Sequence, residues 1–219
     1  MSEWVEGTPL SNLIAWGKQS ERDRIGLLLM RFNVSGHIRC GLLYGDPHPG
    51  NFLVLPDGRL GVVDYGACAA IPEHVIALGA DMADVALNGS LADLDAALRR
   101  HGFVAADCEA DIATMAAELD ILMEPLIDPN FTFTPEWLRA RVRSATDLRL
   151  TNVVRQLSCP TELTAFGRAI FAGAGVLCQL NAAGPFRDEI ARWLPGVDVA
   201  IARRLERETE PALSSVPRS

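Results

Sequence analysis

The sequence predicts a mainly helical α+β fold that contains one small β-hairpin. At least six segments carry apolar residues at helical spacing. Only one segment, residues 52–63, has two short apolar runs separated by a turn signal, Pro56-Asp57-Gly58. The chain has 219 residues, and 49% of them are hydrophobic, which is enough for a sizeable core. We therefore expect a helical body in which the hairpin is a local feature.

Helical patterns follow one another along most of the chain. A short helix is expected over residues 11–16, and a longer one from Glu21 to Ile38 has Ile25 and Leu29 on one side. Further helices are expected over residues 73–87, 91–101, 107–123, 135–157, 163–181, 186–193 and 197–207. The helical body thus covers residues 11–207. The last residues are charged or rich in proline and serine, so residues 208–219 are expected to be a disordered tail.

Composition argues against several classes of function. The net charge of -8 disfavours binding to nucleic acid and attraction to anionic lipid through overall charge. The five cysteines form no Cys-x-x-Cys pair, which indicates neither a disulfide framework nor a zinc site. We find no signal peptide and no segment that is long and apolar enough to span a membrane. We therefore expect a cytoplasmic protein that could meet a membrane only through its partners.

Residues 44–66 carry two acids and an amide in a fixed order. Asp46 is followed by Asn51 five residues on and by Asp64 thirteen further. A hairpin over residues 52–63 would bring Asn51 beside Asp64, with Asp46 close by. Two carboxylates and an amide oxygen suit Mg²⁺, which keeps waters and takes its other ligands from phosphates. Turn-capping Asp and Asn side chains around a buried hairpin are the structural alternative.

The sequence of this segment resembles that of the UbiB/AarF family of atypical kinases, which is tied to quinone and isoprenoid-lipid metabolism. Asp-Pro-His-Pro-Gly-Asn at residues 46–51 and Asp-Tyr-Gly at residues 64–66 carry the resemblance. The resemblance implies ATP or ADP and Mg²⁺ as cofactors, with Asp46 orienting the acceptor or water. It also implies that Asn51 and Asp64 hold the metal and that His48 shapes the loop or touches phosphate. Tyr44 stands where many relatives have His, either as a hydrogen-bonding ring or as a packed one.

The first ten residues resemble the hinge of the same family. Residues 1–10 are therefore expected to form a hinge-like strand, in which Glu3 and Val5 contact the adenine. The rest resembles a kinase-like large (C-terminal) lobe. The sequence holds no Gly-x-Gly-x-x-Gly, and its single lysine, Lys18, lies in a polar context, so we expect the small lobe to be missing.

Three functions follow from this pattern. The first is a partial UbiB/AarF-like kinase or ATPase that is weakly active or inactive alone. Its expected partners are a nucleotide and either a small-lobe chain or a protein of lipid or quinone metabolism. The second is an aminoglycoside- or choline-type phosphotransferase, although that group more often shows Ile-Asp-x-x-Asp, and Ala67 stands at the last position here. The third is a pseudokinase or helical interaction module, so the sequence leaves open whether the chain is an enzyme.

Overall fold

One long helix, α2 (Gln19–Cys40), runs through the centre of the protein, in a computed structural model that describes residues 4–146, 157–158 and 163–214. It packs against α7 (Thr164–Leu180) and α8 (Phe186–Trp193). Ile25 and Leu29 of α2 are fully buried in this contact, as the helical spacing predicts. Gly41 ends the helix with a φ of 70°, a left-handed conformation that glycine adopts without a steric penalty.

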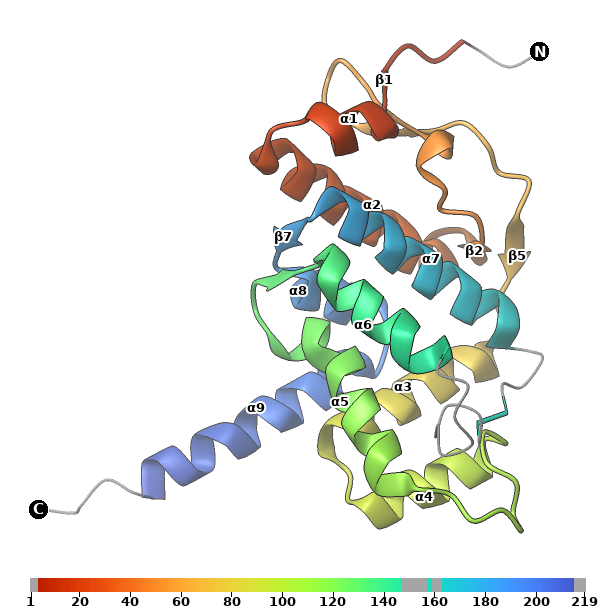
Figure 1. The fold of residues 1–219 in the computed structure, drawn as a ribbon, viewed down its shortest axis with the longest axis vertical. Coiled ribbons are helices and arrows are strands. Elements are labelled where there is room, and N and C mark those ends of the chain that lie inside the picture. The colour runs from red at the N-terminus through yellow and green to blue at the C-terminus, as the bar shows by residue number, and fades with distance from the viewer. Residues whose placement is uncertain (1–3, 147–156, 159–162, 215–219) are drawn as a thin grey trace, which may run out of the picture.

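A second group of helices covers the other side of the core (Figure 1). It comprises α3 (Glu73–Asn88), α4 (Leu91–Arg100), α5 (Ile112–Ile127), α6 (Pro135–Thr146) and α9 (Val197–Ser214). Helix α3 packs on α9, and α4 and α5 enclose a smaller apolar cluster of their own. The short helix α1 (Leu10–Trp16) lies beside α2 near the N-terminus. The mainly helical prediction is confirmed.

The predicted hairpin is present at the expected turn. Strand β3 (Phe52–Val54) pairs with β4 (Leu60–Val62), and Phe52 lies opposite Val62. Gly58 closes the turn with a φ of 84°, and its N–H donates to the carbonyl of Leu55. The hairpin signal at residues 56–58 therefore predicted both the strands and their register.

Other short strands were not visible in the sequence. Strand β1 (Thr8–Pro9) joins the hairpin through β3, β2 (Leu42–Tyr44) pairs with β5 (Cys68–Ala70), and β6 (Phe131–Thr132) pairs with β7 (Ala183–Gly184). Strands of two or three residues are too short to show an alternating pattern, so only tertiary pairing reveals them. Within residues 4–10, the hinge-like strand is limited to Thr8–Pro9, and residues 1–3 lie outside the described chain.

The predicted ends of α5 and α9 differ from the structure. Helix α5 begins at Ile112 rather than at residue 107, because the Asp111 carboxylate caps it by accepting from the Thr114 N–H. Helix α9 continues to Ser214, so the disordered tail predicted from residue 208 is wrong for residues 208–214. The predicted end of α6 near residue 157 follows a stretch, residues 147–156, outside the described residues.

Candidate functional site

The strand pair β2–β5 brings the two halves of the motif segment together at the C-terminal end of α2 (Figure 1). Tyr44, at the end of β2, lies opposite Cys68 of β5. The N–H of Gly45 then donates to the carbonyl of Ala67 at 3.0 Å. The loop that starts at residue 45 is thereby held against the segment that follows Asp64.

The loop from Asp46 to Asn51 is closed by its own hydrogen bonds. The His48 N–H donates to the Asp46 carbonyl at 2.7 Å, and the Asn51 N–H donates to the His48 carbonyl at 2.9 Å. The His48 Nδ1 accepts from the Gly50 N–H at 3.1 Å and so caps a short 3₁₀ turn over Pro49–Asn51. His48 therefore shapes the loop, while its exposed ring leaves a contact with phosphate as a prediction.

Asn51 connects the two acids of the motif. Its Nδ2 donates to the Asp46 carbonyl at 3.1 Å and to the Asp46 Oδ2 at 3.3 Å. The backbone carbonyl of Asn51 accepts from the Val63 N–H at 3.0 Å. Asp64, the residue after Val63, therefore begins beside Asn51 across the hairpin. The Asp64 Oδ1 accepts from the Gly66 N–H at 2.7 Å, and the Asp64 side chain is exposed. Asn51 thus contacts Asp46 through its side chain and lies beside the residue before Asp64 through its backbone, while a site shared by the three side chains stays a prediction.

Tyr44 forms the floor of this edge. Its ring makes edge-on contacts with Phe32 and Phe52, at centroid distances of 5.1 and 5.8 Å. Burial raises the pKa of the Tyr44 phenol; the Asn51 side chain opposes this shift, and the charges of Asp46 and Asp64 add to it. Within the described chain, its buried hydroxyl completes no hydrogen bond in standard geometry. Of the two roles predicted for Tyr44, the packed ring fits the structure.

The aromatic floor was not predicted as part of the site. Phe32 comes from α2 and Phe52 from β3, so no single stretch of sequence places them under the loop. The one available signal was Tyr44 itself, an aromatic residue immediately before the loop motif. Packing three rings here fixes the base of the loop, because buried aromatic side chains dominate local core energetics.

The predicted donor set fits a magnesium–nucleotide site. It offers two carboxylates and one amide, all oxygen donors, and the Asn51 Nδ2 is engaged by Asp46, which leaves Oδ1 for a cation. In the part of the chain that the structure describes, no cluster of three or more His, Cys, Asp or Glu could hold a metal. A metal at this edge would therefore need ligands beyond the protein, such as the waters and phosphate oxygens that Mg²⁺ retains.

The remaining predicted contacts are those of the N-terminal segment. Val5 is 38% exposed and precedes β1, whereas Glu3 lies outside the described residues. The single lysine, Lys18, is exposed at the N-cap of α2. The metal and acceptor roles of the loop residues and the adenine contacts of Glu3 and Val5 stay predictions.

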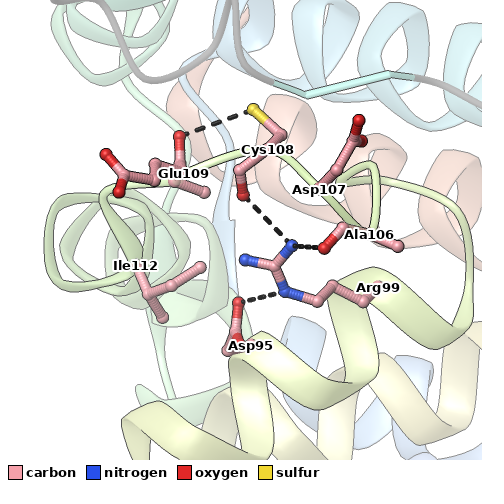
Figure 2. Close-up of a pocket in the computed structure, with 8 residues that line it drawn as sticks. Asp95, Arg99, Ala106, Asp107, Cys108, Glu109 and Ile112 are labelled. Atoms are coloured by element: carbon pink, nitrogen blue, oxygen red, sulfur yellow. Dashed lines mark hydrogen bonds and ion pairs between the residues drawn. The ribbon is translucent and has the colours of Figure 1, made fainter.

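A pocket beside α4 is lined by Arg99, which binds the surrounding backbone (Figure 2). The Arg99 Nε donates to the Asp95 carboxylate at 2.9 Å. The Arg99 Nη1 reaches the carbonyls of Ala105, Ala106 and Cys108. The guanidinium therefore fastens the loop before α5 through its Nε and Nη1 donors.

No helix of the described residues is both long and apolar enough to cross a membrane.

Comparisons with known proteins match the segment that contains the loop. Residues 1–94, which include the whole motif segment, match the model of the ABC1 atypical kinase-like domain. Two chloroplastic proteins of Arabidopsis thaliana are similar to this chain: ACTIVITY OF BC1 COMPLEX KINASE 3, 38% identical over 80 residues, and ACTIVITY OF BC1 COMPLEX KINASE 1, 31% identical over 120 residues. The alignments cover 33% and 53% of this chain but only 10% and 17% of the relatives.

A solved structure extends the likeness to most of the fold. Rv3197 from Mycobacterium tuberculosis, in its complex with erythromycin, matches with a TM-score of 0.76 at 29% identity. The match covers 89% of this chain and 49% of that chain, so the present chain spans about half its length. The predicted kinase-like large-lobe fold is thereby confirmed. Residues 1–94 thus match an ABC1 atypical kinase-like domain of the UbiB type, and curated ABC1 kinases are similar to this chain.

Proposed function

We propose that this chain binds a Mg²⁺-nucleotide at the edge formed by Asp46, Asn51 and Asp64 and is the large-lobe part of an ATP-dependent phosphotransferase or ATPase. One observation carries the proposal: Asn51 hydrogen-bonds Asp46 through its side chain and the strand before Asp64 through its carbonyl. These hydrogen bonds support a site in which the three side chains that kinases use for the acceptor and the metal act together.

Each residue has a distinct task in this proposal. Asp46 accepts a hydrogen bond from the acceptor hydroxyl or water and orients it toward the γ-phosphate. Asn51 Oδ1 and the Asp64 carboxylate hold the cation. When bound, Mg²⁺ would neutralise negative charge that develops on the phosphates. The Asn51–Asp46 hydrogen bond fixes Asp46, which orients the acceptor, relative to Asn51, which holds the metal.

The pathway and partners belong to the proposal as well. We propose an acceptor in quinone or isoprenoid-lipid metabolism, and a partner that covers the phosphates from the side opposite Asp46. The support for such a partner is the composition: the chain has one lysine, exposed at the N-cap of α2, and no Gly-x-Gly-x-x-Gly. Charge-assisted contacts of this kind contribute about 1.5–3 kcal/mol each, so nucleotide binding by the chain alone should be weak.

Calorimetry with Mg-ADP and Mg-ATP tests the proposed site. We expect binding that needs Mg²⁺ and weakens about tenfold or more in Asp64→Asn, because the substitution removes one charge-assisted ligand. Asp120→Asn is the matched control, since it removes the same charge from an exposed position on α5. Tight binding that survives Asp64→Asn, or equal losses in both variants, would place the nucleotide elsewhere.

A further inference from the structure

An apolar cavity lies in the helical body. Leu43 of β2, the strand that leads into the loop from Asp46 to Asn51, forms part of its wall. Its volume is about 300 Å³, at the small end of the range for ligand sites. Residues from α2, α3, α5 and α7 line it, among them Met30, Ala83, Leu126, Phe171 and Leu177. At about 30 Å³ per atom, taken from the volume of a water molecule, it would hold on the order of ten heavy atoms.

Two hydrogen-bond acceptors on α2 stand in the wall of this cavity. Asn33 and His37 both line it and are four residues apart, so their side chains share one face of the helix. Among the described residues, the buried Asn33 Oδ1 and His37 Nε2 have no hydrogen-bond partner. Asn33 as a whole is only 9% exposed. Buried polar atoms in native proteins are nearly always paired, so two orphans on one face of a cavity indicate a missing donor.

The chemistry of the two atoms is defined by their surroundings. His37 hydrogen-bonds to the backbone of Val34, and since Nε2 is the unpaired nitrogen, the donor is Nδ1–H. Burial lowers the pKa of His37, which keeps the ring neutral and leaves Nε2 as an acceptor. The Asn33 Nδ2 lies against Gly173 of α7, where an added Cβ would be 2.5 Å away. The Asn33 amide therefore packs closely against α7. Its Oδ1 and the His37 Nε2 are the two unpaired acceptors that the described residues place in the cavity wall.

We propose that this cavity binds a small apolar molecule that carries a hydroxyl or N–H donor, paired with the Asn33 Oδ1 and the His37 Nε2. The apolar body of the ligand replaces water against α3, α5 and α7, and its donor satisfies the orphaned acceptors. Leu43 of β2 lines the cavity, whereas its neighbour Tyr44 belongs to the floor of the loop from Asp46 to Asn51. The ligand would thus lie behind the loop, and its binding does not depend on phosphoryl transfer.

Two isomeric probes separate the donor from the apolar body. The probes 1-nonanol and methyl octyl ether each have ten heavy atoms, but only the alcohol can donate a hydrogen bond. Calorimetry on the full chain should show 1-nonanol binding about tenfold more tightly, because only it pairs acceptors that are otherwise unsatisfied. Asn33→Leu combined with His37→Phe should remove this preference and leave the affinity for the ether within about threefold.

A pair of glycine substitutions locates the binding in the cavity. Gly79 on α3 lines the cavity and Gly167 on α7 does not, and an added Cβ meets no atom within 4 Å at either position. Leucine favours helix over glycine at both sites, so both variants should fold. We expect Gly79→Leu to abolish binding of 1-nonanol and Gly167→Leu to retain it.

Three outcomes would overturn the proposal. The first is equal affinity of the wild-type chain for the alcohol and the ether. The second is undisturbed binding of 1-nonanol to Gly79→Leu. The third is no binding of either probe to the folded wild-type chain, which would mean that water alone pairs Asn33 and His37.

Discussion

The contact between α2 and the end of α7 depends on Gly26. An added Cβ at this position would lie 2.5 Å from the Ala182 Cβ, about 1 Å inside ordinary van der Waals contact. Both atoms are attached directly to backbone, so neither can rotate away and the segments must separate. Gly26→Ala should therefore cost about 1–3 kcal/mol through overpacking, against a gain of about 0.5–1 kcal/mol in helix propensity. The expected net loss is about 1–2 kcal/mol.

The matched control is Gly79→Ala, the same substitution in α3. No atom lies within 4 Å of an added Cβ there, so only the helix-propensity gain should remain. In a domain of this size each kcal/mol shifts Tm by about 2–4 °C. Thermal unfolding should therefore show a fall of about 2–8 °C for Gly26→Ala and a rise of about 1–4 °C for Gly79→Ala.

A double-mutant cycle identifies the clash as the cause. Ala182→Gly removes the atom that the new Cβ would meet, so the cost of Gly26→Ala should become smaller in that background. Urea unfolding provides the free energies for the cycle. The reasoning is refuted if Gly26→Ala and Gly79→Ala shift stability in the same direction, or if the cost of Gly26→Ala is unchanged in the Ala182→Gly background.

Two further predictions concern charge and catalysis. The Arg31 side chain lowers the pKa of Glu189 through a two-pronged ion pair, so this stability is present above the unfolded pKa of about 4.5 and is lost as pH falls toward the folded value. Urea unfolding from pH 7 to pH 3 should show a shallower decline for Glu189→Gln than for wild type; parallel curves would contradict this. The chain alone should turn over little ATP, and fusion to a relative's small lobe should raise turnover, because phosphoryl transfer depends on charge placed on both sides of the phosphates. Robust turnover by the unfused chain that Asp46→Ala abolishes would show that no further lobe is needed.

The local features of the fold were encoded in short stretches of sequence. Residues 56–58 predicted the hairpin, because a tight turn between apolar runs sets the register of two strands without help from the rest of the chain. The same hairpin brings the Asn51 carbonyl to the Val63 N–H, so the backbone next to Asp64 lies beside Asn51 as the spacing predicts. Helices with regular apolar spacing, such as α2 and α8, were also predicted because one buried face leaves a repeating pattern.

Features that depend on segments far apart in the chain were decided by the tertiary structure. The start of α5 was misplaced because Arg99 of α4 holds the preceding loop and Asp111 caps the helix, two contacts that no apolar period records. The β2–β5 pair, which holds the loop from Asp46 to Asn51, is three residues long and has no pattern of its own. The orphaned acceptors of Asn33 and His37 face a cavity because several helices meet around them, and burial of this kind exists only once the chain has folded.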